Sequence, residues 1–174
     1  MLYTGRGDKG DTSFFGAPGR VSKTDPAIEV LGALDELNSL LGVCRTKVPH
    51  DVAEFLRTLQ HDLFILQAET AGAPKAMKEE KIVRLEEKVA EIEKGLPPIK
   101  TFFVPGATES GAFLDLARTV ARRAERRLVA VRESGVTVGA PALQYLNRLS
   151  SVLYALSRQV THSSGITEEP PTYS

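Results

Sequence analysis

Apolar residues recur every three or four positions along five stretches of this sequence, and this spacing limits the fold more than any other property of the chain. It puts apolar side chains on one face of an α-helix, whereas a β-strand would need strict alternation. Breaks containing Gly and Pro separate the stretches, which we expect at about residues 25–48, 51–70, 78–94, 110–133 and 141–160. Five helices with short connections predict an all-α fold, a five-helix bundle.

The segments outside these helices have a different composition. Residues 1–24 are expected to be a glycine-rich loop, residues 25–162 the bundle, and residues 163–174 a polar, mobile tail. Lys100–Val104 is β-like in composition but has no partner strand in the sequence, so we expect an extended linker. The chain of 174 residues is an ordinary size for a single domain, which we assign to residues 1–174.

Composition excludes several classes of protein. Lys and Arg total 22 and so do Asp and Glu, so no overall positive field favours nucleic acid or an anionic membrane. Cys44 is the only cysteine, which rules out an internal disulfide and fits a reducing compartment. The sequence shows neither a signal-peptide pattern nor an apolar run long enough for a membrane span. We therefore expect a cytoplasmic protein without nucleic-acid or membrane partners.

The fourth predicted helix carries the sharpest polar pattern. Arg118, Arg122 and Arg126 recur at every fourth position, and Glu125 falls on the same side as Arg118 and Arg122. Like charges at this spacing each cost about 0.2–0.5 kcal/mol, so a polyphosphate or neighbouring acids must offset them. A solvated basic face is an equally good interpretation of the spacing alone, since Asp115 and Glu125 already supply acidic partners three residues from an arginine. Arg123 and Arg127 fall on the opposite side and are expected at the surface.

Two other helices carry polar residues beside their apolar stripes. Asp35 and Asn38 lie one turn apart on the first helix, and Asp35 could pair with an arginine of the fourth if both are buried. Asn147 and Arg148 interrupt the leucines of the fifth helix. Hydrogen bonding within the bundle explains this pair as well as contact with a ligand does.

The glycine-rich loop could bind an anion through backbone N–H groups and through hydroxyl and ammonium groups. Its glycines also spell G-x-G-x-x-G from Gly5, but no strand precedes it and no helix follows, so a dinucleotide fingerprint is rejected. A Walker A pattern is absent from the sequence, and so are the Glu-x-x-His pairs of di-iron bundles and any Cys/His cluster typical of zinc. We therefore predict no protein-held metal centre.

Taken together, several segments resemble the PduO-type ATP:cob(I)alamin adenosyltransferases. The resemblance covers nearly the whole chain in order, apart from the second and third helices and the tail. Its motifs are YTGRGDKGDTS at 3–13, RVSKTDP at 20–26, LDELNS at 34–39, FFVPG at 102–106, LARTVARRAERR at 116–127 and YLNRLS at 145–150. Ser151 departs from the Asp that is common in the family, and Gly5-Arg6 departs from its usual loop.

The resemblance implies a ferritin-like five-helix bundle that forms a homotrimer, with each ATP held by the loop of one subunit and the arginine helix of its neighbour. Arg118 would pair with Asp35, and Phe102 would cover the lower face of the corrin and displace the axial base of cobalt. The implied ATP contacts are Thr4, Gly5, Arg6, Gly7, Thr12, Ser13, Lys23, Arg122, Arg123, Glu125, Arg126 and Asn147.

The implied reaction is transfer of the 5′-deoxyadenosyl group of ATP to cob(I)alamin, with Mg²⁺ accompanying ATP and cobalamin as substrate. Cob(II)alamin would be reduced beforehand, so a flavoprotein reductase and a B12-dependent enzyme are expected partners. Two alternatives remain open from the residues themselves. One is an ATP-binding cobalamin carrier or sensor without turnover, and the other is a structural scaffold whose arginines pair with acids.

Overall fold

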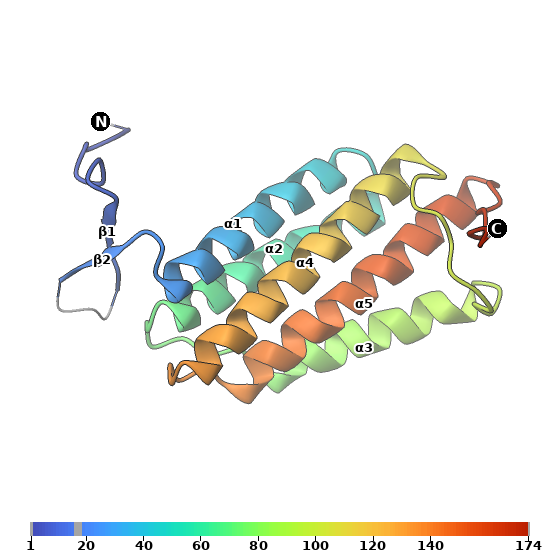
Figure 1. The fold of residues 1–174 in the computed structure, drawn as a ribbon. Coiled ribbons are helices and arrows are strands. Elements are labelled where there is room, and N and C mark those ends of the chain that lie inside the picture. The colour runs from blue at the N-terminus through green and yellow to red at the C-terminus, as the bar shows by residue number, and fades with distance from the viewer. Residues whose placement is uncertain (1, 16–18, 174) are drawn as a thin grey trace.

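The computed structural model describes residues 2–15 and 19–173. Five helices lie alongside one another as a bundle, and a small hairpin projects from one end (Figure 1). The elements are β1 (Asp11–Ser13), β2 (Arg20–Ser22), α1 (Pro26–Arg45), α2 (His50–Thr70), α3 (Glu79–Lys94), α4 (Glu109–Glu133) and α5 (Ala140–Ser163). The predicted helical bundle is confirmed, and each helix begins and ends within a few residues of its predicted bounds.

Capping residues account for where the helices begin. The Asp25 carboxylate accepts a hydrogen bond of 2.9 Å from the Ala27 N–H, and Pro26 occupies the first helical position of α1. The Thr108 hydroxyl likewise accepts from the Gly111 N–H at the start of α4. Such caps contribute about 1 kcal/mol each. The start at Asp25 and Pro26 was predicted, whereas the Thr108 cap was not.

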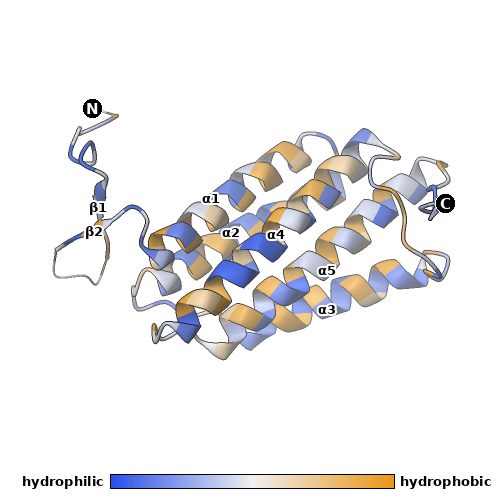
Figure 2. Cartoon of the chain, viewed as in Figure 1, coloured by the Kyte–Doolittle hydropathy of each residue, from blue (hydrophilic) through white to orange (hydrophobic). Residues whose placement is uncertain are grey.

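The core lies where α4 packs against both α1 and α5, while α2 covers α1 and α3 covers α5. Full burial of a leucine stabilises the fold by about 1.5–3 kcal/mol, and the predicted apolar stripes supply many such residues. The fully buried leucines include Leu34, Leu37, Leu41, Leu59, Leu63, Leu85, Leu128, Leu146 and Leu153. In Figure 2 the side of α4 that faces the viewer is strongly hydrophilic along its middle.

One buried carboxylate ties three helices together. Asp62 of α2 is 2% exposed, and it accepts a hydrogen bond of 3.0 Å from the Tyr145 hydroxyl of α5. It also pairs with Lys81 and Arg84 of α3. Burial, reinforced by the Asp62 charge, raises the pKa of Tyr145 well above its ordinary value, so the phenol stays a donor. A buried charge requires such partners, which explains why the mostly charged α3 docks on this side.

The glycine-rich segment differs from the prediction of a plain loop. β1 and β2 pair antiparallel with Thr12 opposite Val21. Each strand has only three residues, too few for apolar alternation to reveal it in the sequence. Lys100–Val104 lies outside any strand, as predicted. Across the described ranges, each helix is too short or too polar to cross a bilayer.

Candidate active site

A cavity of about 550 Å³, pocket 1, lies between α4, α5 and the α3–α4 linker. Four segments that are distant in sequence contribute to it. They are the linker at 99–105, α4 with Asp115, Arg118 and Arg122, α5 with Ser150, Ser151 and Tyr154, and the tail with Glu168. A pocket of this size, apolar on one side and charged on the other, is typical of a small-molecule site.

The linker gives pocket 1 an aromatic wall. Phe102 is 78% exposed, although a large apolar side chain normally avoids water, and Phe103 beside it is half-buried. Pro97 and Pro98 cannot continue a helix, so α3 ends before them and an extended linker begins. Phe102 is therefore presented to pocket 1 by a short extended segment, and its contact with a corrin stays a prediction.

Arg118 of α4 also lines pocket 1. Its Nε donates a hydrogen bond of 3.4 Å to Oδ1 of Asp115, and its guanidinium lies 5.9 Å from the centre of the Tyr154 ring. Asp115 in turn accepts from the Ser157 hydroxyl at 3.1 Å. Within this chain the expected partner Asp35 is exposed on α1 and forms no ion pair with Arg118. The i, i+3 neighbour Asp115 takes its place because it lies one helical turn away.

Arg122 also belongs to a second cavity, pocket 2, of about 250 Å³. Its other lining residues are Glu125, Arg126, Val129 and Asn147. The Asn147 amide nitrogen donates a hydrogen bond of 2.8 Å to Oε1 of Glu125. Because Arg122 lines both cavities, pocket 1 and pocket 2 adjoin across this one side chain.

The two outer arginines of α4 face a different neighbour. Arg123 pairs with Glu36, and Arg127 pairs with Glu29 at 3.2 Å, both acids belonging to α1. The prediction that Arg123 and Arg127 point away from Arg122 is confirmed, but acids of α1 partner them there. In this chain Arg123 therefore lies apart from pocket 2, and its role as an ATP contact stays a prediction.

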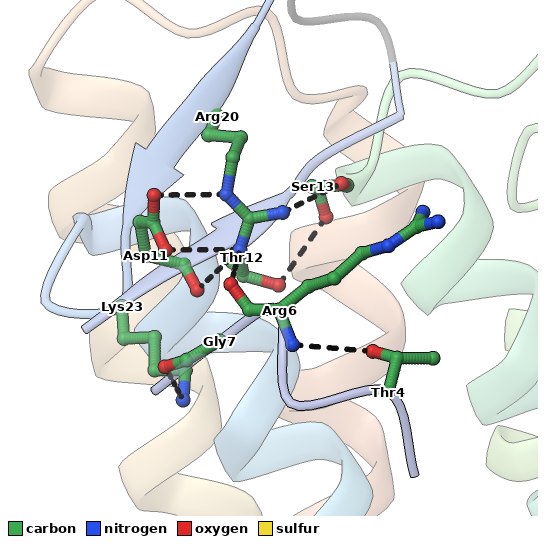
Figure 3. Close-up of polar contacts among 8 residues, drawn as sticks. All are labelled: Thr4, Arg6, Gly7, Asp11, Thr12, Ser13, Arg20 and Lys23. Atoms are coloured by element: carbon green, nitrogen blue, oxygen red, sulfur yellow. Dashed lines mark hydrogen bonds and ion pairs between the residues drawn. The ribbon is translucent and has the colours of Figure 1, made fainter. Parts of the chain in front are cut away.

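The hairpin is organised around Arg20 (Figure 3). Its guanidinium donates to both carboxylate oxygens of Asp11 at 2.8 and 2.9 Å and to the carbonyl oxygens of Arg6 and Asp11 at 2.7 and 2.9 Å. The Arg20 hydrogen bond lowers the pKa of the Asp11 carboxyl below its ordinary value. Arg20 thus fixes the turn of residues 5–10 against β1. Neither Arg20 nor Asp11 was among the predicted site residues.

The predicted loop residues gather around this arrangement. Lys23 donates from Nζ to the Gly7 carbonyl oxygen at 2.8 Å, and the Thr4 hydroxyl accepts from the Arg6 N–H. Gly5 has a positive φ of 67°, which favours glycine. The loop surrounds pocket 3, a cavity of about 550 Å³ lined by Gly5, Arg6, Asp8, Lys9, Asp11 and Arg20. Thr12 and Ser13 lie on β1 beside it.

The hairpin and the arginines of α4 do not form one site within a single chain. Pocket 3 shares no lining residue with pocket 1 or pocket 2. Figure 1 shows the hairpin reaching away from its own bundle beyond the start of α1. The described residues also contain no group of three or more His, Cys, Asp or Glu side chains arranged to hold a metal ion.

Several residues that line these cavities were not among the predicted site residues, including Asp11, Arg20, Asp115, Tyr154 and Glu168. The one-turn spacing did indicate Asp115 as a partner of Arg118, and that pairing is confirmed. Tyr154 follows Ser150 by one turn, so the two residues share a face of α5, but this spacing indicates a site less strongly than an acid next to an arginine does. Glu168 lies in the tail and carried no pattern at all.

A family model described as cobalamin adenosyltransferase matches residues 2–160. The chain belongs to the cobalamin adenosyltransferase family. Among curated members of this family, the corrinoid adenosyltransferase PduO of Citrobacter freundii is 39% identical over 94% of this chain and 50% of its own length. The corrinoid adenosyltransferase of Bacillus subtilis is 36% identical over 95% of this chain and 89% of its own length. The chain thus spans about half the length of the PduO relative and most of the Bacillus one.

Solved structures of the family have the same fold. A variant PduO-type ATP:corrinoid adenosyltransferase from Lactobacillus reuteri, complexed with cobalamin and ATP, superposes with a TM-score of 0.93 at 28% identity. The alignment covers 99% of this chain and 97% of that chain. A second variant from the same organism, complexed with ATP, gives a TM-score of 0.91 at 29% identity over 98% of this chain and 100% of that one.

Proposed function

We propose that this chain transfers the 5′-deoxyadenosyl group of ATP to cob(I)alamin and releases tripolyphosphate. The observation that carries the proposal is the position of Arg122, which lines both the aromatic pocket 1 and the polar pocket 2. A flat corrin suits the wall that contains Phe102, and a triphosphate suits the arginines of pocket 2. The reacting carbon of ATP would then lie between them.

The transfer itself needs little acid–base chemistry. The cobalt(I) of the substrate supplies an electron pair to C5′ of ATP, the cobalt–carbon bond forms, and the C5′–O bond breaks with its electrons leaving on tripolyphosphate. The contribution of the protein is to hold the two substrates in line. Arg122 and Arg126 would stabilise the charge that develops on the leaving group, because planar guanidinium groups bind phosphate oxygens two at a time.

Mg²⁺ would accompany ATP rather than occupy a protein cage. This ion usually binds through substrate phosphates with one or two carboxylates. Glu125 lines pocket 2 and could supply a carboxylate there. When bound, the ion would neutralise part of the triphosphate charge.

Phe102 would act on cobalt before the transfer. Cobalt(II) is easier to reduce when its lower axial position is empty, and an apolar ring against that face would exclude both water and the displaced base. The exposure of Phe102 toward pocket 1 in the ligand-free chain supports this role. A flavoprotein would supply the electron, and a B12-dependent enzyme would receive the product.

The complete ATP site would require two protomers, which we propose to be neighbours in a homotrimer. The hairpin carries Thr4, Gly7 and Lys23 away from its own α4, so a neighbouring α4 is the surface it could meet. Arg118 of one protomer could then pair with Asp35 of another, since Asp35 is exposed on α1 and Arg118 is part-exposed in pocket 1. Arg123 would likewise contact an ATP molecule that is held by the hairpin of a neighbouring protomer.

The activity is tested with ATP, Mg²⁺ and chemically reduced cobalamin. We expect the corrin absorbance to change to that of adenosylcobalamin, with tripolyphosphate appearing in the phosphorus NMR spectrum. Bound ATP without tripolyphosphate would identify a carrier or sensor instead. An unchanged Tm in the presence of ATP would leave only the structural scaffold.

The shared site is tested by mixing two inactive variants after reversible dissociation. Lys23→Ala damages the hairpin and Arg122→Ala damages α4, so a mixed trimer would contain some sites with neither change. We expect partial recovery of adenosylcobalamin formation on mixing. Absence of recovery, with native mass spectrometry showing mixed trimers, would place both residues in one protomer's site.

A further inference from the structure

The tail after α5 lies against the linker that carries Phe102 (Figure 1). The Val104 N–H donates a hydrogen bond of 2.8 Å to the Glu169 carbonyl oxygen, which joins the two segments through their backbones. Glu168, the preceding residue, lines pocket 1. Polar composition alone predicts a mobile tail, whereas these contacts fix its middle part beside the candidate site.

A buried arginine lies at the centre of this contact. Arg158 of α5 is 6% exposed, and its guanidinium lies 4.0 Å from the centre of the Phe103 ring. On another side, its Nη1 lies 2.7 Å from Oε2 of Glu168. A cation held over an aromatic face at this distance attracts the ring, and a planar guanidinium can stack on it. Arg158 therefore contacts the linker and the tail at once.

We propose that Arg158 is a positioning residue that links Glu168 of the tail to Phe103 of the linker and so holds Phe102 at pocket 1. This inference rests on the proposed function, since it concerns the part of the site assigned to the corrin. Phe102 is too exposed to be fixed by packing of its own side chain, so its position depends on the backbone on either side. Phe103 and Val104, the next two residues, are the ones that Arg158 and Glu169 hold.

The character of the ion pair favours positioning over simple stabilisation. Burial raises the pKa of Glu168, while the attraction of Arg158 opposes that rise. Desolvation thus cancels much of what the pair would contribute to the free energy of unfolding. Among the described residues neither Nε nor Nη1 of Arg158 has a well-aligned hydrogen bond, so the contact of Nη1 with Glu168 is an ion pair only, another cost of keeping this side chain buried. A pair that adds little stability can still fix geometry.

The experiment compares Glu168→Gln with Glu169→Gln, a matched control because the structure uses only the backbone of Glu169. Phe103→Leu serves as a second variant that breaks the linker contact and keeps an apolar side chain. The first measurement is amide hydrogen exchange of the peptide 99–107 in the ligand-free full-length protein. It is independent of any activity.

The second measurement follows turnover from cob(II)alamin and KM for ATP in the same variants. We expect Glu168→Gln and Phe103→Leu to speed linker exchange about tenfold and to lower cob(II)alamin turnover about ten- to hundredfold, because small misplacements cost this much. KM for ATP should stay within about twofold, since pocket 2 is untouched. Glu169→Gln should match the wild type in linker exchange, in turnover from cob(II)alamin and in KM for ATP.

The outcomes separate the two claims. Linker exchange that is unchanged in Glu168→Gln and Phe103→Leu overturns the positioning role, whatever the activity. Faster exchange in a protein whose wild type forms no adenosylcobalamin keeps the link between tail and linker but refutes the proposed function. Faster exchange with undiminished turnover from cob(II)alamin shows a structural contact only, and also overturns the proposal.

Discussion

Asn147 of α5 and Glu125 of α4 are joined by a hydrogen bond of 2.8 Å from amide nitrogen to carboxylate oxygen, and this contact forms one wall of pocket 2. The Asn147 amide oxygen is itself held by Arg148, at 2.7 Å, so the amide orientation is fixed. Among the described residues neither Arg122 nor Arg126 forms an ion pair, so both guanidinium groups are available for an anion.

Removing this contact should weaken ATP binding. We expect Asn147→Ala to raise the Kd for ATP about two- to tenfold, the value of one ordinary hydrogen bond. Asn147→Asp should raise it further, since a second negative charge would repel both Glu125 and the triphosphate. Isothermal titration calorimetry measures both. Equal Kd values in the two variants and the wild type would remove this wall from the ATP site.

Arg122 should contribute more than any neutral group in the site. Loss of its charged hydrogen bonds in Arg122→Ala is expected to raise the Kd for ATP about 10- to 150-fold, with Tm nearly unchanged. Arg122→Lys should fall between, because an ammonium cannot bind two oxygens at once. Arg127→Ala is the control, since Arg127 pairs with Glu29 on the α1 side. A similar rise in the Kd for ATP in Arg127→Ala would indicate that ATP responds to the overall positive charge of α4 rather than to a specific site.

Phe102 should matter for reduction more than for transfer. Phe102→Ala is expected to lower turnover from cob(II)alamin much more than turnover from pre-reduced cob(I)alamin, because water or the base could then reach the axial position. Phe64→Ala removes another exposed phenylalanine, 61% accessible on α2 and outside pocket 1, and should change neither rate. Equal losses with the two cobalt states would contradict the axial role.

The hairpin pair should respond to pH in a defined direction. Arg20 lowers the folded-state pKa of Asp11 below the ordinary value of 3.8. The contribution of this pair is therefore fully present above pH 3.8 and is lost as the pH falls through the lowered pKa. NMR titration of the Asp11 carboxyl carbon should show this midpoint, and Arg20→Ala should return it to the ordinary range. An unshifted midpoint in the wild type would show that the pair does not form in solution.

The same pair should influence ATP binding at neutral pH. Asp11→Asn keeps the shape of the side chain but removes its charge, so Arg20 would hold the turn of residues 5–10 less firmly. We expect the Kd for ATP to be severalfold higher in Asp11→Asn than in the wild type. The ratio of the two Kd values should be constant between about pH 6 and pH 8, because Asp11 of the wild type stays ionised throughout that range. A Kd equal to that of the wild type would limit Arg20 and Asp11 to a structural role.

Helices and their starts could be predicted because their causes are local. The leucine at every third or fourth position, Asp25 before Pro26, and the glycines after α4 act within one or two turns. The grouping of Arg118, Arg122 and Glu125 on one side of α4 also follows from helical geometry. The hairpin was missed because strands of three residues have no period to detect.

Partners across the bundle could not be read in the same way. Asp35 forms no ion pair with Arg118 in this chain, whereas Glu36 pairs with Arg123 and Glu29 pairs with Arg127. Several carboxylates are compatible with each arginine at the level of spacing. The choice among them depends on how α1 and α4 are rotated against each other, and packing of the whole core sets that rotation.

Periodicity, capping residues and motif order were therefore sufficient for the five helices, for the arginine side of α4 and for the family resemblance. The meeting of Arg158 with Phe103 and Glu168, the buried partners of Asp62, and the adjoining of two cavities at Arg122 emerged only once the chain was folded. The physical reason is the distance along the chain over which the interactions act. Secondary structure is decided by neighbours along the chain, whereas a cavity is decided by burial of all the apolar faces together, which brings residues distant in sequence into contact.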